Sequence, residues 1–567
     1  MKYQGCAASR GVAIANIFCY NDQSLPVEEK HLDEVLRREE VECYRAAIVK
    51  AGQQLEEVYE HCARHDADKA KIFQAHIDIL QDVQVREEVE TAILEEGKCA
   101  QWAVASIYDM YAEVFAGMED SLMRERAADL KDVSDRLQRV LLNAPPAVSL
   151  ADLPENTLLV AHDLIPSQTV TLDSSRVAGI VTEVGGMTSH TAILARSFGI
   201  PAVLGIPGIL GDVTDGMEAI LDGIEGILIT KPSAEQLSLY RDKQEEFKRV
   251  QDYERAFLPM QPVTLDGKRI SVNLNIGDPD DTHYRPFLPY VDGVGLFRSE
   301  FLYLSRKELP SEDEQYEIYS RTLRYFGTRP VILRTLDIGG DKKTDCITIP
   351  QEDNPFLGLR ALRLCFAMPG LFRTQLRAAF RAAVNGNLWI MFPMVNSIED
   401  IRKAKAFCRD VCDELEREGT AYRRDVPIGI MIETPSIALM AEEAAEECDF
   451  CSIGSNDLCQ YTMAVDRMSP IVRPYYMSYH PSVLRLINMI IKAFAARGKT
   501  VGICGELGGD PKIVPVLIGM GMEKLSMNPS AVASVKSAIC NLDSHKARQL
   551  AEKALSCTTE EEVKALL

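Results

Sequence analysis

The spacing of apolar and polar residues changes three times along the chain. Residues 2–20 alternate in the manner of a β-strand, and residues 28–145 then carry apolar residues at helical spacing with few Gly or Pro. Residues 153–230 return to short apolar strands, such as 157–160 and 226–230, with Gly and Pro between them. This order predicts a helical bundle inserted into a compact α/β domain.

A different alternation begins after residue 232. The charged stretch Pro232–Phe257 has few helix breakers and predicts one long linking helix. Beyond residue 262, apolar strands alternate with helical segments, and eight such alternations are typical of a (β/α)8 barrel. The predicted strands are Ile270–Ile276, Gly293–Arg298, Val331–Leu336, Leu388–Met394, Ile428–Ile432, Cys451–Gly454, Thr500–Cys504 and Lys524–Met527.

Charged or reactive residues stand at the carboxyl ends of five of these strands. Active sites of such barrels gather at that face, so the pattern predicts a catalytic mouth rather than solvated strand ends. The residues are Arg298 and Glu300, Arg334 and Asp337, Glu433, Asn456 and Asp457, and Cys504 with Glu506.

The strand ends combine hard oxygen ligands with cations. Glu433 and Asp457 come from neighbouring strands, a pairing expected for Mg²⁺, although a buried carboxylate paired with a nearby Arg would look the same. Arg298, Arg334 and the following Lys342 form a cationic clamp suited to a phosphate group. Together these residues indicate phosphoryl transfer.

A histidine further upstream has the surroundings of a phosphoryl acceptor. His190 follows an apolar strand, Val177–Thr182, and a Gly-Gly turn, and it precedes a short predicted helix, Ala192–Phe198. The first turn of a helix has unpaired N–H groups and a positive dipole, which keep an imidazole neutral and favour a phosphoryl group on it. The structural alternative for His190 is a histidine that caps the helix or packs in the core. For Cys504, the structural alternative to a reactive thiol is a small core residue.

Composition narrows the classes of function. The chain has 567 residues, enough for three or four domains, and 46% hydrophobic residues, which is ordinary for globular proteins. Its net charge of −22 argues against nucleic acid or an anionic membrane as the main partner and favours a basic protein. No apolar run approaches a membrane span, and fifteen scattered cysteines suit reduced thiols in a cytoplasm.

Several long, ordered motifs occur in the chain: Gly185–Arg196, Leu296–Leu302, Arg334–Asp341, Asn354–Arg363, Ser452–Arg467 and Cys504–Asp510. Together they resemble enzyme I of the bacterial sugar phosphotransferase system, the phosphoenolpyruvate–protein phosphotransferase family. The resemblance runs through the whole chain, including the helical insert at Lys71–Leu80 and Glu125–Leu137.

The resemblance implies a domain organisation. Residues 1–25 plus 146–231 would form a phosphohistidine-carrying α/β domain that swivels, and residues 26–145 a helical domain that binds the carrier protein HPr. Residues 232–261 would be the linker helix. Residues 262–567 would form the phosphoenolpyruvate-binding (β/α)8 TIM-type barrel and pair it into a homodimer.

The resemblance also implies a role for each substrate-binding residue. Arg298, Arg334 and Lys342 would hold the phosphate of phosphoenolpyruvate, whereas Asn456 and Arg467 would hold its carboxylate. Mg²⁺ on Glu433 and Asp457 would bridge the two groups and neutralise developing charge.

Three further residues would carry out the chemistry. His190 would attack phosphorus through Nε2, with Thr169 orienting its other nitrogen, and Cys504 would protonate the departing enolpyruvate. The phosphoryl group would then pass to a histidine of HPr or a similar carrier. Three features depart from the family pattern. Met187 replaces a usual basic residue, Gln168 replaces a usual carboxylate, and the docking helices are less acidic than usual at Ala67, Gln81, Val83 and Gln84.

Other functions share parts of this pattern. Pyruvate phosphate dikinase and phosphoenolpyruvate synthase need a large ATP-binding domain, but the residues before 150 are helical and lack a glycine-rich phosphate loop. A non-catalytic paralogue that senses phosphoenolpyruvate or scaffolds a regulator would be expected to have a broken catalytic set. The sequence identifies neither the carrier nor the choice between sugar uptake and regulation.

Overall fold

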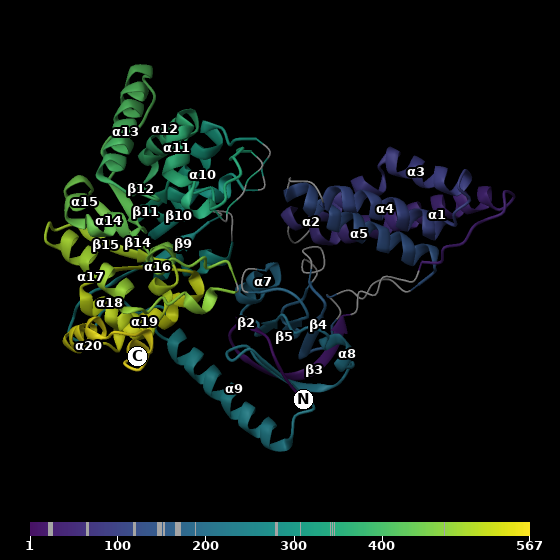
Figure 1. The fold of residues 1–567 in the computed structure, drawn as a ribbon, viewed down its shortest axis with the longest axis horizontal. Coiled ribbons are helices and arrows are strands. Elements are labelled where there is room, and N and C mark those ends of the chain that lie inside the picture. The colour runs from purple at the N-terminus through teal and green to yellow at the C-terminus, as the bar shows by residue number, and fades with distance from the viewer. Residues whose placement is uncertain are drawn as a thin grey trace. The chain divides into compact units, whose positions relative to one another are not determined.

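The computed structural model divides the chain into two compact units, Met1–Arg249 and Val250–Leu567 (Figure 1). It describes residues 1–567 except 21–26, 64–66, 117–120, 145–149, 151–152, 165–171, 187–188, 278–281, 305, 307, 341, 343, 345 and 470. The side chain of His190 also lies outside the description. Among the described helices, none combines the length and hydropathy needed to span a membrane.

An eight-stranded mixed sheet forms the centre of the first unit, in the order β1-β8-β7-β3-β4-β5-β6-β2. Strand β3 pairs in parallel with β4, although more than 130 residues separate them in sequence, so the helical stretch between them is an insertion, as predicted. The strands are β1 Lys2–Gln4, β2 Cys6–Ser9, β3 Val12–Tyr20, β4 Thr157–Ala161, β5 Val177–Thr182, β6 Ala202–Leu204, β7 Glu218–Asp222 and β8 Ile227–Thr230.

The inserted segment is helical and has its own apolar core. Tyr44, Leu55, Val104 and Leu137, which come from three of its helices, are each fully buried in that core. The helices are α1 Arg37–Ala63, α2 Ala67–Leu80, α3 Val83–Leu94, α4 Ala100–Ala116 and α5 Ser121–Leu141. The predicted bundle is therefore confirmed.

Three further helices accompany the sheet. Helices α7 (His190–Phe198) and α8 (Ile209–Asp212) follow sheet strands, and α9 (Ala234–Arg255) is the predicted linking helix. No residue of α9 is buried, in keeping with its highly charged sequence. Lys243 on α9 forms an ion pair with the buried Asp222 at the end of β7, which ties the first part of this helix to the sheet.

The second unit is a closed barrel of eight parallel strands in the order β10-β11-β12-β13-β14-β15-β16-β9, so the fold prediction is confirmed. Strand β12 ends two residues earlier than predicted, because Met394 has a positive φ of 51° that a strand cannot continue. The strands are β9 Ser271–Ile276, β10 Val294–Arg298, β11 Pro330–Arg334, β12 Asn387–Phe392, β13 Ile428–Ile432, β14 Phe450–Gly454, β15 Thr500–Cys504 and β16 Lys524–Met527.

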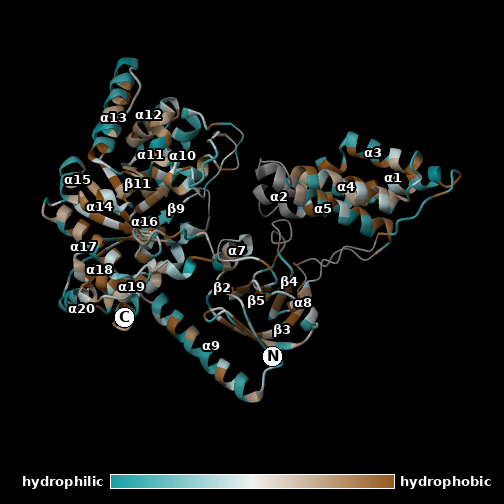
Figure 2. Ribbon diagram, in the orientation of Figure 1, coloured by the Kyte–Doolittle hydropathy of each residue, from teal (hydrophilic) through white to brown (hydrophobic). Residues whose placement is uncertain are grey.

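Helices surround the barrel, and apolar residues dominate its strands (Figure 2). Local sequence defines several helix ends: Ser311 and Glu314 form a capping box at the start of α10, and Ser397 and Asp400 form one at α13. The helices are α10 Glu312–Phe326, α11 Ala361–Ala367, α12 Pro369–Ala382, α13 Ile398–Glu418, α14 Pro435–Leu439, α15 Ala441–Glu447, α16 Ser455–Met463, α17 Pro481–Ala495, α18 Val514–Met520, α19 Val532–Cys540, α20 Ser544–Ser556 and α21 Glu560–Lys564.

A glycine permits the close packing of α18 against α20. A Cβ atom at Gly519 would lie 2.0 Å from the carbonyl oxygen of Ala547 and 2.9 Å from Cβ of Ala551. We expect Gly519→Ala to lower the free energy of unfolding by about 3 kcal/mol, because the two helices must move apart. Gly370→Ala on α12 is the control, since no heavy atom lies within 4 Å of its added Cβ. Equal free energies of unfolding in urea for the two variants would contradict this account.

Candidate functional site

The polar residues named from the sequence meet at the carboxyl end of the barrel. Arg298, Arg334 and Cys504 are the last residues of β10, β11 and β15. Glu433 follows β13 directly, and Asp457 lies in the first turn of α16, which begins where β14 ends. Because all eight strands are parallel and the sheet is closed, these positions share one mouth.

Arg334 and Lys342 are held by two buried carboxylates. Nη1 of Arg334 lies 2.9 Å from Oδ2 of Asp337, and its Nη2 pairs with Glu300. Nζ of Lys342 lies 2.7 Å from the same Asp337 oxygen and 3.1 Å from Oε1 of Glu300. Burial raises the pKa of both carboxyl groups, but the cations outweigh it, so both pKa values lie below the usual range.

Two buried donors and one whole guanidinium remain available to a ligand. Within the described part of the chain, Nε of Arg334 and Nε of Arg360 are buried without a hydrogen-bond partner. The side chain of Arg298 is half-buried and forms no hydrogen bond or ion pair with any described residue. A buried donor without a partner is costly, and an anionic ligand would satisfy all three groups.

Arg360 is a member of the site that the strand-end pattern does not reveal. Its guanidinium is 1% exposed, and Nη2 lies 2.9 Å from Oδ1 of Asp337. Its Nη1 lies 3.4 Å from Oδ1 of Asp457 and donates to the hydroxyl of Tyr461 at 3.2 Å. It precedes α11 and is not at a strand end, so its only sequence signal is its place in the motif Asn354–Arg363.

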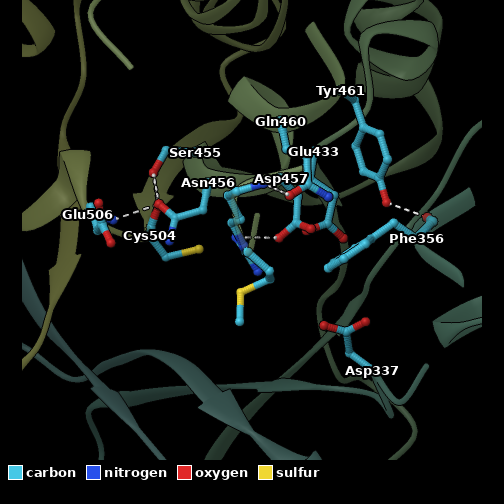
Figure 3. A network of polar contacts seen from close by, with 12 residues as sticks. Asp337, Phe356, Glu433, Ser455, Asn456, Asp457, Gln460, Tyr461, Cys504 and Glu506 are labelled. Carbon is cyan, nitrogen blue, oxygen red and sulfur yellow. Dashed lines mark hydrogen bonds and ion pairs between the residues drawn. The ribbon is translucent and has the colours of Figure 1, made fainter. Parts of the chain in front are cut away.

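Glu433 is a buried carboxyl group with no paired cation. One oxygen accepts the N–H of Met394 at 2.6 Å, and no ion pair to it occurs within the described residues. Burial, together with the charges of Asp457 and Asp337, raises its pKa to about 8. Glu433 and Asp457 lie close together in Figure 3. Two adjacent carboxyl groups that repel each other fit a divalent cation.

Asp457 is paired with arginines, so the alternative to a metal ligand, a buried carboxylate paired with a nearby Arg, applies to it in part. Its two oxygens lie 3.4 Å from Arg360 and 3.4 Å from Arg467, both of which are longer than a strong ion pair. Among the described residues, no group of three or more His, Cys, Asp or Glu side chains could hold a metal. A cation on Glu433 and Asp457 would therefore take its remaining ligands from substrate and water.

Asn456 and Cys504 occupy the other side of the mouth (Figure 3). The side-chain oxygen of Asn456 accepts the N–H of Glu506 at 3.0 Å and the hydroxyl of Ser455 at 3.4 Å, which orients the amide group. Burial is the main reason that the pKa of Cys504 is raised to about 11. Its thiol therefore keeps its proton at neutral pH, as an acid catalyst requires.

His190 lies in the first unit, at the first position of α7. The helix begins two residues earlier than predicted because Ser189 caps it, accepting the N–H of Ala192 at 3.2 Å. The backbone of His190 thus lies in the first turn of a helix. Thr169, Gln168 and Met187 lie outside the described residues, and their predicted effects on His190 stay predictions.

Comparison with known proteins finds similarity over the whole chain. Family models match residues 251–544 as "PEP-utilising enzyme, PEP-binding domain", residues 4–126 as "PEP-utilising enzyme, N-terminal" and residues 153–226 as "PEP-utilising enzyme, mobile domain". Proteins named phosphoenolpyruvate-protein phosphotransferase are similar throughout. The Priestia megaterium protein is 40% identical, covering 99% of this chain and 98% of its own length. The Listeria innocua protein is 41% identical, covering 100% and 98%.

The raised pKa of Glu433 predicts a pH-dependent stability. A carboxyl group whose pKa is raised by folding stabilises the fold at low pH and loses that contribution as pH rises through about 8. Relative to Glu433→Gln, the metal-free wild type should lose up to about 1.4 kcal/mol of unfolding free energy per pH unit between about pH 5 and 8. Urea unfolding at several pH values measures the difference.

The control is the exposed Glu442, whose replacement by Gln should leave the pH profile parallel to that of the wild type. Added Mg²⁺ should offset the loss at the high end of the range in the wild type only, because the cation favours the ionised carboxylate. Parallel profiles for the wild type and Glu433→Gln would contradict the assignment.

Proposed function

The chain belongs to the phosphoenolpyruvate–protein phosphotransferase family, and from this premise we propose that it catalyses the family reaction through His190. The enzyme takes the phosphoryl group from phosphoenolpyruvate, releases pyruvate and passes the group to a histidine of an HPr-type carrier. This is the first step of the sugar phosphotransferase system. The observation that carries the proposal is the barrel mouth, where unpaired cationic donors surround a pair of carboxyl groups.

Binding of phosphoenolpyruvate would use the cations of the mouth. Arg298 and Arg334 have donors free for the phosphate, and Lys342, fixed by its two carboxylates, lies beside Arg334. Arg467 and the amide nitrogen of Asn456 would hold the substrate carboxylate, since the amide oxygen is already used by Glu506. With these roles, every anionic group of the substrate would have a charged or amide donor.

We propose Mg²⁺ as the cation on Glu433 and Asp457. When bound there, it would neutralise the charge that develops on the phosphate and enolate oxygens. The residues themselves support this choice, because the ligands are oxygens and the remaining positions are left for substrate and water. Removal of divalent cations by a chelator should then prevent phosphoryl transfer.

His190 would be the nucleophile. Its backbone lies in the first turn of α7, where N–H groups are unpaired and the helix dipole is positive. Such a field would keep an imidazole neutral before reaction and would stabilise a phosphoryl group after it. Thr169 would orient the second ring nitrogen. Attack on phosphorus breaks the bond to the enol oxygen, so the departing group leaves as enolpyruvate.

Cys504 would complete the first half-reaction. Enolpyruvate becomes pyruvate when its methylene carbon gains a proton, and the raised pKa of this thiol keeps the proton available. The second half-reaction needs the carrier, which would dock on the helical domain at residues 26–145. His190 would move between the two sites by a swivel of the α/β domain formed by residues 1–25 and 146–231, across the linker helix at 232–261.

Two further properties, the oligomeric state and the cellular location, belong to this proposal. The barrel domain, residues 262–567, would form a homodimer, and the exposed apolar side chains of Met468, Ile471 and Tyr475 offer it surface to bury. The enzyme would act in the cytoplasm. All fourteen cysteines with described side chains are free thiols, as expected in a reducing compartment.

The test is the mass of the intact protein after incubation with phosphoenolpyruvate and Mg²⁺. We expect a gain of one phosphoryl group, about 80 Da, that is labile in acid, because phosphohistidine is nitrogen-linked. His190→Ala should show no gain. If the wild type binds phosphoenolpyruvate without gaining mass, the chain is a sensor or scaffold built on the same barrel.

A further inference from the structure

The interior of the barrel beneath Cys504 is partly polar. Inward-facing positions alternate along a strand, so Thr500, Gly502 and Cys504 form a column from the amino-terminal to the carboxyl-terminal end of β15. Apolar side chains fill one side of the interior, among them Leu296 and Phe450. Serine, threonine and asparagine residues lie among these apolar side chains, and together they line a small cavity.

Ser452 is the nearest polar neighbour of the Cys504 thiol. Its hydroxyl donates toward the sulfur at 3.7 Å, while the thiol donates to the carbonyl of Ile453 at 3.5 Å. Both side chains are buried, at 3% and 2% exposure. Ser452 lies on β14 at the level of Gly502, one layer below Cys504. The serine hydroxyl is therefore directed to return a proton to sulfur.

A cavity of about 20 Å³ adjoins Ser452. Such a volume holds one water molecule, and the polar atoms around it would bind that water. Gly502 keeps the space open, because a Cβ atom there would lie 3.6 Å from Oγ of Ser452 and 3.7 Å from Cβ of Lys524. Most of the lining is apolar, from residues such as Val294, Ile332 and Phe450, and its polar residues are Asn273, Ser452, Thr500, Lys524 and Ser526.

Lys524 and Thr500 lie at the other end of the column. They are the first residues of β16 and β15, and both are partly exposed at the amino-terminal mouth of the barrel. Nζ of Lys524 lies 3.5 Å from the hydroxyl of Thr500 and 4.5 Å from the centre of the Trp389 ring. Burial lowers the pKa of Lys524, so its ammonium group releases a proton more readily than an exposed lysine does.

We propose that protons reach Cys504 through the barrel, from the amino-terminal mouth by way of a cavity water and the Ser452 hydroxyl. The inference rests on the proposed role of Cys504 as the acid. The S–H bond breaks as a C–H bond forms on enolpyruvate, and the thiolate then takes the proton of Ser452. Serine takes a proton from the water, and the water takes one from Lys524 or solvent. The route delivers protons to the Cys504 thiol from the side opposite the substrate.

The test uses the exchange of labelled pyruvate into phosphoenolpyruvate in D₂O with Mg²⁺, which needs no carrier protein. Each exchange of carbon moves a proton onto Cys504 and back. Deuterium enters the methylene carbon of phosphoenolpyruvate only if the thiol exchanges with solvent in between. Mass spectrometry measures the carbon label and the deuterium in phosphoenolpyruvate. The ratio of deuterium to exchanged carbon reports solvent access to the thiol independently of the rate of phosphoryl transfer.

Gly502→Ala is the informative variant, because its methyl group fills the cavity at ordinary contact distances and contacts no substrate-binding residue at the carboxyl end of the barrel. We expect carbon exchange within about twofold of the wild type and about tenfold less deuterium per exchanged carbon. Ser452→Ala removes the hydroxyl instead of the water and should lower the same ratio. Gly370→Ala, on α12, should leave both labels unchanged.

The outcomes separate this inference from the proposed function. Wild-type deuterium ratios in both Gly502→Ala and Ser452→Ala would show that the thiol is supplied from the substrate side, and the inference would be wrong. Absence of carbon exchange in the wild type would instead refute the proposed function, and the relay with it. Thermal unfolding of each variant confirms that it is folded.

Discussion

The burial of charge at the carboxyl end of the barrel constrains the rest of this structure. Arg334, Asp337 and Arg360 are each at most 5% exposed, and a buried charge left without a partner costs several kcal/mol. The loops after β10 and β11 and the segment before α11 must therefore hold their charged residues against one another. This requirement brings Glu300, Asp337 and Arg360 together from three separate parts of the chain.

The same network prepares the mouth for an anion. Glu433, with its pKa raised to about 8, is largely protonated at neutral pH until a cation binds, so the cations of the mouth outnumber its ionised carboxylates. Among these cations, Arg298, Arg334 and Arg360 have donors that no described residue satisfies. The cations are Arg298, Arg334, Lys342, Arg360 and Arg467, and the carboxyl groups are Glu300, Asp337, Glu433, Asp457 and Glu506. A folded protein keeps such donors unpaired only at an energetic cost, which a phosphate-bearing ligand would remove.

Sequence pattern predicted the strands well because each barrel strand is a short apolar run that ends in polar residues. All eight were placed, and the largest differences, two residues, are at the carboxyl ends of β11 and β12, where the positive φ of Met394 ends β12. Arg360 was missed as a site residue because its contacts are long-range: it reaches Asp457, 97 residues away. No local spacing encodes such a pairing. The helix that begins at His190 was predicted two residues late, since the cap at Ser189 was not considered.

The interior of the barrel departs from the rule that such barrels are filled with bulky branched side chains. Leu296, Ile332 and Phe450 follow the rule, whereas Ser452 and Gly502 leave space beside them. Poorly packed positions in a protein core are commonly functional, because other interactions must offset the dispersion contacts and apolar burial that are lost there. Here the lost packing lies in one column that runs from Lys524 to Cys504. The gap is lined by apolar side chains such as Ile332 and Phe450 together with the polar side chains of Ser452, Thr500 and Lys524. These polar groups give a water molecule in the gap hydrogen-bond partners, as a path for protons requires.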